Sequence, residues 1–174
     1  MNRLDIKRIQ IREALQRLGG CGGQGRLKVR DVMTPAPSCI ASSTSVLDVV
    51  RMFQTKEFRH LLVTDSQGRL LGLVSDRDVL RTLGPDRQPD QERLAAIAVM
   101  DIMSADLITA PPDWPLASAT SEMLGHGISC LPVLADDKLV GILTNTDVQT
   151  VLEVLLQTSQ PAPAAQPVRA STPA

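Results

Sequence analysis

Residues 72–79 read Gly-Leu-Val-Ser-Asp-Arg-Asp-Val, and residues 141–148 read Gly-Ile-Leu-Thr-Asn-Thr-Asp-Val. In both stretches an apolar run is followed by a hydroxyl residue and, three positions later, by an aspartate. This pattern predicts a strand that leads into a helix. Because the stretch occurs twice in a chain of 174 residues, the sequence predicts a duplicated unit whose two copies bury their apolar faces against each other.

The duplication extends well beyond this stretch. Residues 29–34 (Val-Arg-Asp-Val-Met-Thr) return as residues 99–104 (Val-Met-Asp-Ile-Met-Ser), and Leu-Leu-Val at 61–63 returns as Leu-Pro-Val at 131–133. The offset is 70 residues for both of these blocks but 69 for the stretch that begins at Gly72. One residue is therefore missing from the second copy, in the loop before that stretch, where a turn tolerates a deletion.

Each copy is expected to contain the same elements in the same order. A leading extended segment (34–40 and 104–110) precedes an amphipathic helix, and two strands and a second helix follow. The apolar positions expected on the first helix of each copy are Val46, Val49, Val50 and Phe53, and then Leu116, Ala119 and Met123. One such unit cannot cover both faces of its small sheet. The expected fold class is therefore α/β, with two βαββα-type repeats packed through their sheets.

Composition shifts divide the chain into five predicted segments. A basic amphipathic helix with a Gly-rich linker comes first, and a tail rich in Pro, Ala, Ser and Gln comes last and is expected to be disordered. Two repeats separated by a connector lie between them. The predicted boundaries are 1–25 for the helix and linker, 26–84 for repeat 1, 85–98 for the connector, 99–157 for repeat 2 and 158–174 for the tail.

The composition is that of a soluble globular protein, with 43% hydrophobic residues and a formal net charge of −1. No apolar run approaches the roughly 18 residues that a membrane-spanning helix needs. The three cysteines have no metal-binding spacing, which favours a reducing, cytoplasmic location. Residues 1–30 nevertheless carry a charge of +6, and the remainder of the chain carries −7.

Residues 4–18 are predicted to form the basic helix, because Leu4, Ile11 and Leu15 fall on one side of it. Three roles remain open. The apolar positions favour packing on its own module or on a dimer partner. The local charge of +6 permits contact with nucleic acid or an anionic membrane. The helix is also suited to docking an effector protein.

The paired residues Ser75 with Asp78 and Thr144 with Asp147 are the strongest candidates for a functional role. One interpretation is a capping box, in which hydroxyl and acid satisfy the first amides of each helix. The other is a ligand site, since a helix N-terminus attracts anions and a neighbouring carboxylate suits the two hydroxyls of a ribose. The residue pattern alone does not decide between them.

Taken together, the repeated motifs resemble the paired modules of the cystathionine β-synthase (CBS) domain family, often called a Bateman module. The resemblance runs from about residue 29 to residue 156 and rests on Val-Met-Thr-Pro at 32–35, Ile-Met-Ser at 102–104, Arg-His-Leu-Leu-Val-Thr-Asp at 59–65 and the two stretches that begin at Gly72 and Gly141. It implies two clefts between the modules that bind adenosine derivatives: AMP, ADP, ATP or S-adenosylmethionine. Asp78 and Asp147 would then hold ribose hydroxyls, and Ser75 and Thr144 would approach phosphate.

By the same resemblance, each cleft combines one motif with the leading segment of the other repeat. The first cleft is expected to contain Arg59, His60, Ser75, Arg77 and Asp78 with Leu107, Ile108 and Thr109. The second is expected to contain Thr144, Thr146 and Asp147 with Ser38, Cys39 and Ile40. The second cleft has no basic residue nearby in the sequence, whereas Arg59 and Arg77 make the first cleft cationic. The first cleft is therefore predicted to take the phosphorylated nucleotide.

The sequence thus predicts a regulatory module that senses adenine nucleotides, with the nucleotide as regulatory ligand and no required cofactor. By resemblance we expect a homodimer. The alternatives are a ligand-free structural dimerisation module and a nucleic-acid-binding regulator that uses the basic helix. No nucleophile with a base and no metal-binding motif is present, and His60 and His126 have no ligand at metal spacing. The chain is therefore not expected to be an enzyme, to hold a metal or to contact a membrane.

Overall fold

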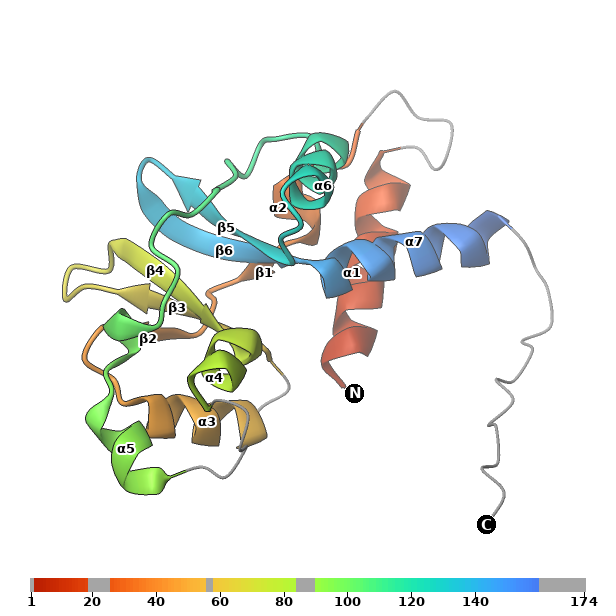
Figure 1. Cartoon of the computed structure of the whole chain (residues 1–174). Coiled ribbons are helices and arrows are strands. Elements are labelled where there is room, and N and C mark those ends of the chain that lie inside the picture. Colours follow the sequence, from red (N-terminus) through yellow and green to blue (C-terminus); the bar gives the residue numbers. More distant parts are fainter. Residues whose placement is uncertain (1, 19–25, 56–57, 84–89, 160–174) are drawn as a thin grey trace, which may run out of the picture.

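The computed structural model describes residues 2–18, 26–55, 58–83 and 90–159. Its strands form two three-stranded sheets, which lie one over the other in Figure 1. In the first, β3 lies between β2 and β4; in the second, β6 lies between β1 and β5. The strands are β2 (Cys39–Ala41), β3 (His60–Thr64) and β4 (Leu70–Ser75), and β1 (Thr34–Pro35), β5 (Cys130–Ala135) and β6 (Lys138–Thr144).

The two repeats are interleaved rather than merely stacked. Strand β1 comes from the first repeat but pairs antiparallel with β6 of the second, with Thr34 opposite Ile142. In the reciprocal exchange, Leu73 and Ser104 donate to each other's carbonyl oxygens, both at 2.9 Å. Each repeat therefore supplies a leading segment to the sheet of the other, which explains why the Met-Thr and Met-Ser motifs recur at the start of both copies.

Two glycines permit this exchange. A Cβ atom at Gly72 would lie 2.5 Å from Met103 Sδ, and one at Gly141 would lie 2.5 Å from Met33 Sδ. Carbon and sulfur do not approach so closely without displacement, so a side chain at either position would push the exchanged segment away. The methionine of each leading segment thus packs on the glycine that opens the other repeat's motif.

Helices cover the outer faces of the sheets, and each sheet has a core cluster to which both repeats contribute. Leu62, Leu73, Cys130 and Ile142 form a third cluster to which both sheets contribute. The predicted α/β class with two packed repeats is confirmed. The helices are α2 (Val29–Val32), α3 (Val46–Thr55), α4 (Asp76–Leu83), α5 (Gln91–Ala96), the 3-10 turn η2 (Val99–Asp101), α6 (Leu116–Gly125) and α7 (Asn145–Ser159).

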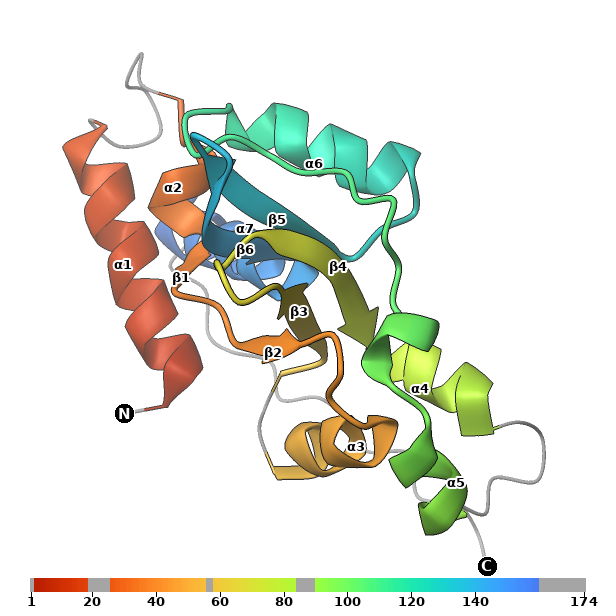
Figure 2. The same ribbon diagram turned by 90° about the vertical axis from the view of Figure 1, so that its left-hand side faces the viewer.

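The basic N-terminal helix packs on its own module. Helix α1 (Arg3–Arg17) lies against α2 and α7, as Figures 1 and 2 both show. Asn2 caps it through a reciprocal capping box with Asp5. Ile11 is buried in the core cluster of the second sheet and Ala14 is buried as well, whereas Ile6 and Ile9 are exposed. Of the three roles left open, packing is the one this arrangement supports.

The C-terminal helix extends past the boundary that was predicted for the tail. Helix α7 continues to Ser159, two residues into the segment predicted as tail, and the Thr158 hydroxyl donates to the carbonyls of Val154 and Leu155. The predicted boundary at 158 thus falls in the last turn of this helix. The rest of the predicted tail, 160–174, and the Gly-rich stretch 19–25 lie outside the described residues. Within the described part of the chain, no helix is long and apolar enough to cross a bilayer.

Candidate functional site

The two hydroxyl–acid pairs do form helix caps. At the start of α7, one oxygen of Asp147, Oδ2, accepts from the Thr144 amide and from the Thr144 hydroxyl, both at 2.8 Å. At the start of α4, Asp78 Oδ2 accepts from the Ser75 amide at 2.8 Å and from its hydroxyl at 2.7 Å. Each cap leaves the other carboxylate oxygen, Oδ1, for a different partner.

The partners of these second oxygens differ sharply between the repeats. Asp78 Oδ1 lies 3.2 Å from a guanidinium nitrogen of Arg81, whose side chain is 79% exposed. Asp147 Oδ1 lies 3.0 Å from Lys7 Nζ, and the two side chains are only 8% and 4% exposed. A pair with one exposed partner contributes little to stability, whereas two buried charges depend strongly on each other. The Asp147 pair is therefore the firmer of the two.

A cavity of about 270 Å³ opens beside the Asp147 pair, between the two repeats. Its apolar wall includes Pro37, Phe58, Leu62 and Ile142. The polar and charged residues of its lining come from α1, from both repeats and from the start of α7: Arg3, Lys7, Thr34, Ser38, Arg59, His60, Ser129, Thr144, Asn145, Thr146 and Asp147. An apolar wall with a few converging polar groups is typical of a small-molecule site.

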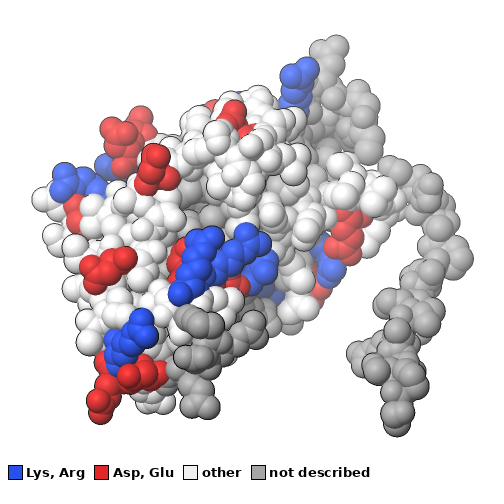
Figure 3. Space-filling model, viewed as in Figure 1, with Lys and Arg blue, Asp and Glu red and all other residues white. Residues whose placement is uncertain are grey.

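The imidazole of His60 joins the two repeats at this cavity. Its Nε2 atom is hydrogen-bonded to the Ser129 hydroxyl at 2.8 Å. Burial lowers the pKa of His60, so the ring is neutral at pH 7. The positive charge around the cavity therefore comes from Arg3, Lys7 and Arg59 and not from His60. Figure 3 shows basic side chains gathered in the middle of one face of the molecule.

The cavity brings together some of the predicted nucleotide-binding residues and not others. Those that line it are Ser38, Arg59, His60, Thr144, Thr146 and Asp147. Eight others are not in its lining: Cys39, Ile40, Ser75, Arg77, Asp78, Leu107, Ile108 and Thr109. The predicted role of all fourteen in ligand binding remains a prediction.

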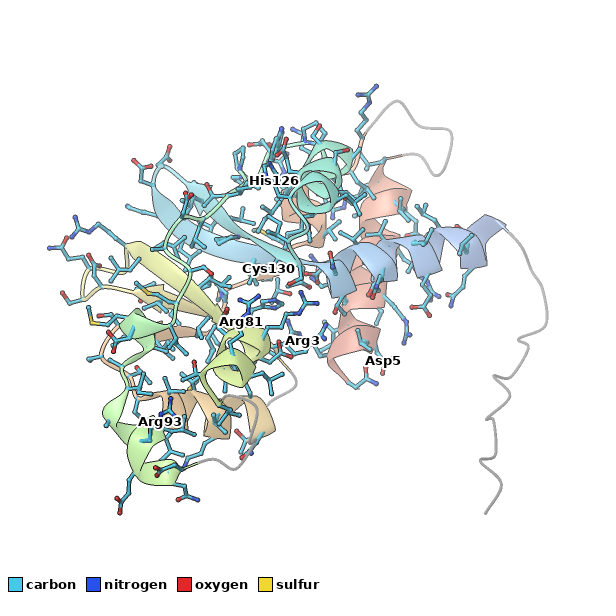
Figure 4. The ribbon with its side chains drawn as sticks, viewed as in Figure 1. Arg3, Asp5, Arg81, Arg93, His126 and Cys130 are labelled. Atoms are coloured by element: carbon cyan, nitrogen blue, oxygen red, sulfur yellow. The ribbon has the colours of Figure 1, made fainter. Side chains whose placement is uncertain are left out.

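The lining combines residues that the sequence assigned to different clefts. Arg59 and His60 were assigned to the Asp78 cleft, and they line the cavity of Asp147. The second cleft, beside Asp147, was expected to have no basic residue. Arg3 and Lys7 of α1 nevertheless line it, along with Arg59. Figure 4 shows Arg3 on the part of α1 near the repeats. The predicted preference of phosphate for the first cleft therefore loses its basis.

Lys7 is the residue that sequence reasoning missed. It lies on the same helical face as Ile11 and Ala14, because residues spaced by four and seven positions fall on one side of a helix. Both of those residues are buried, and so is Lys7. A lysine within an apolar stripe was the available signal, since a buried lysine requires a partner. Which acid it would meet could not be read from the spacing.

Burial sets the chemistry of the two described cysteines. It raises the pKa of the Cys130 thiol to about 12, with a further contribution from Asp78. Cys39 is exposed, and partial burial raises the pKa of its thiol. The reactive form of a cysteine is the thiolate, so Cys130 is protected twice, by inaccessibility and by protonation.

We therefore expect Cys39 to react with a maleimide at pH 8 at least tenfold faster than Cys130, a ratio of about the size that accessibility and thiolate fraction together produce. Peptide mapping by mass spectrometry after short labelling measures each cysteine separately. Urea-unfolded protein is the control, in which the two rates should become similar. Equal rates in the folded protein would contradict the burial of Cys130.

Among the described residues, no three His, Cys, Asp or Glu side chains lie close enough together to hold a metal ion. His126 instead lies 3.3 Å from Glu122 one turn earlier on α6.

Comparison with known proteins places this architecture in a family. The family model for the CBS domain matches residues 29–84 and 99–154. Among solved structures, a Vibrio cholerae protein named AcuB is 28% identical with a TM-score of 0.68, over 80% of this chain and all of that one. CBSX2, solved in complex with AMP, is 31% identical with a TM-score of 0.62, over 76% of this chain and 98% of that one.

The curated relatives are longer proteins. Homoserine O-acetyltransferase of Methanohalobium evestigatum is 29% identical over 126 residues, which is 72% of this chain and 24% of that protein. Inosine-5'-monophosphate dehydrogenase of Nitrosopumilus maritimus is 32% identical over 126 residues, or 70% of this chain and 24% of that protein. The chain thus spans about a quarter of the length of these relatives.

Proposed function

The chain belongs to the CBS domain family, and from that premise we propose that it is a regulatory module that binds an adenosine nucleotide in the cavity between its two repeats. The observation that carries the proposal is the cavity's composition. It joins an apolar wall, a hydroxyl–acid pair at a helix N-terminus and the guanidinium group of Arg59 in one space. These groups match the base, the ribose and the phosphate of a nucleotide in turn.

The proposed arrangement follows from the chemistry of each wall. The adenine lies against Pro37, Leu62 and Ile142, where burial of apolar surface favours it. The ribose hydroxyls are directed to Asp147, an acceptor-only group when ionised. The phosphate lies near Arg59, whose guanidinium group suits phosphate oxygens. The AMP complex of CBSX2, a relative at 31% identity, supports AMP as the first ligand to test.

Replacing Arg59 with alanine is expected to weaken AMP binding about tenfold, the loss typical of one charge-assisted contact. Isothermal titration calorimetry of the full chain measures the affinity. Arg69→Ala is the matched control, because Arg69 is an exposed arginine paired with Asp65 on the β3–β4 hairpin, away from the cavity lining. Absence of binding by the unmodified chain to AMP, ADP, ATP and S-adenosylmethionine would sink the proposal. Equal affinities for both variants would remove Arg59 from the site.

Signalling by such a module requires a second arrangement that the ligand binds with a different affinity. We propose that the module works as a homodimer in a reducing, cytoplasmic setting and has no catalytic activity of its own. Exposed leucines on the outer helices support association: Leu80 on α4, Leu124 on α6, and Leu152 and Leu156 on α7.

The dimer proposal predicts that Leu152→Asp with Leu156→Asp shifts the chain from dimer to monomer, because two charges would replace apolar contacts at the core of the interface. Sedimentation velocity measures the mass directly. Leu71→Asp, at an exposed apolar position on β4, is the control. A monomeric unmodified chain would contradict the proposal.

A further inference from the structure

Helix α1 lies outside the two segments that match the CBS domain, 29–84 and 99–154. It nevertheless contributes Arg3, Leu4 and Lys7 to the cavity lining. The family repeats therefore do not build this wall of the cavity. A helix outside the two matched segments does, and its contact with the site is a direct one.

The contact between Lys7 and Asp147 occupies the carboxylate that the ribose hydroxyls would need. Lys7 Nζ lies 3.0 Å from Asp147 Oδ1 and also donates to the carbonyl of Val32. The other oxygen of Asp147 already accepts from Thr144, and the side chain is 4% exposed. Burial lowers the pKa of the Lys7 ammonium, and Asp147 opposes that shift. A ribose cannot reach Asp147 while Lys7 remains there.

The size of the cavity agrees with a partly filled site. Its volume of about 270 Å³ lies just below the range of about 300–1,000 Å³ that is usual for small-molecule pockets. Movement of Lys7 and Leu4 would enlarge it from one side without disturbing either sheet, because both side chains belong to α1.

Many of the contacts that hold α1 against the rest of the chain are polar. Arg8 pairs with Glu153 on α7 through two bonds of 3.0 and 3.1 Å. Gln10 donates to the Asp31 carbonyl at 3.1 Å, and Arg12 donates to Gln157 at 2.8 Å. Ile11 and Ala14 are the fully buried apolar side chains of the helix. Water can replace polar contacts of this kind, so the helix is separable at modest cost.

We propose that α1 is a built-in competitor of the nucleotide: Lys7 holds the position at Asp147 that the ribose requires, so ligand binding there and seating of α1 exclude each other. The proposal rests on the proposed function of this cavity. Its consequence is a switch. Nucleotide binding releases α1 and exposes the face of Ile11 and Ala14, while nucleotide loss lets the helix return.

The test is calorimetric titration of the full chain with AMP. Lys7→Met is expected to bind AMP about tenfold more tightly, since a site held closed nine-tenths of the time loses that factor in apparent affinity. Glu153→Gln loosens the seat without touching the cavity and should gain about twofold to fivefold, the worth of a surface ion pair. Lys28→Met is the matched control, because it removes the same charge from an exposed pair with Asp113, and it should leave the affinity unchanged.

Hydrogen exchange on α1 provides the second readout and should increase when AMP binds to the unmodified chain. If no variant binds AMP, the proposed function fails. If the unmodified chain binds AMP while Lys7→Met binds equally or more weakly, the competitor fails and the function stands. Should Lys7→Met not fold, Glu153→Gln decides: an affinity no higher than that of the unmodified chain overturns the proposal.

Discussion

Replacement of Asp147 by alanine is expected to lower the free energy of unfolding by about 2–3 kcal/mol, because Lys7 loses its buried partner and α1 either keeps an unpaired charge or leaves its place. The variant also loses the cap at the start of α7, where Asp147 accepts from Thr144. The equivalent change Asp78→Ala removes a similar cap but frees only the exposed Arg81. Its expected cost is about 1 kcal/mol.

Urea unfolding of both variants measures this difference. The double variant Lys7→Met with Asp147→Ala isolates the ion pair, since removing both charges avoids an unpaired one. We expect the double variant to be more stable than Asp147→Ala alone. An Asp147→Ala variant no less stable than Asp78→Ala would show that Lys7 is not held by this carboxylate.

Replacement of Leu62 by alanine is the second large effect, with an expected cost of about 2–5 kcal/mol. Leu62 is fully buried in the cluster to which both sheets contribute, with Leu73, Cys130 and Ile142. Because the repeats exchange their leading segments, the lost packing should weaken both of them together. We expect a single unfolding transition at a lower urea concentration.

Far-ultraviolet circular dichroism and Trp114 fluorescence measure this in one titration, because Trp114 packs against the core of the second repeat while circular dichroism reports on both. The control is Met100→Ala on η2, whose side chain is 57% exposed. It should change stability by less than about 0.5 kcal/mol. Separate transitions for the two signals in Leu62→Ala would mean that the repeats fold independently.

The architecture was predictable because each repeated stretch specifies its own strand and helix through residues that are close in the sequence. The stretches that begin at Gly72 and Gly141 correctly placed a strand before a helix in each copy. The hydroxyl–acid pairs form the cap contacts that one of their two interpretations required. Exchange of the leading segments could not be seen, because the pairing of β1 with β6 joins residues about a hundred positions apart.

The candidate site was predictable only in part, for the same reason. Local motifs located Thr144 and Asp147, but the neighbours of these residues depend on how the repeats face each other. The sequence therefore did not show that Arg59 lines the cavity of Asp147. Lys7 was missed because its partner, Asp147 on α7, lies 140 positions away in the sequence. Apolar periodicity reports that a helix face is buried and does not report what covers it.

A crystal structure of the full chain grown with saturating AMP tests the central claim most directly. The account predicts AMP in the cavity beside Ser38 and Thr144, with its ribose hydroxyls donating to Asp147 and the Lys7 ammonium displaced from that carboxylate. A cavity without nucleotide at saturating AMP would contradict the proposed function. AMP bound in the cavity with Lys7 still paired to Asp147 would contradict the competition between the helix and the ligand.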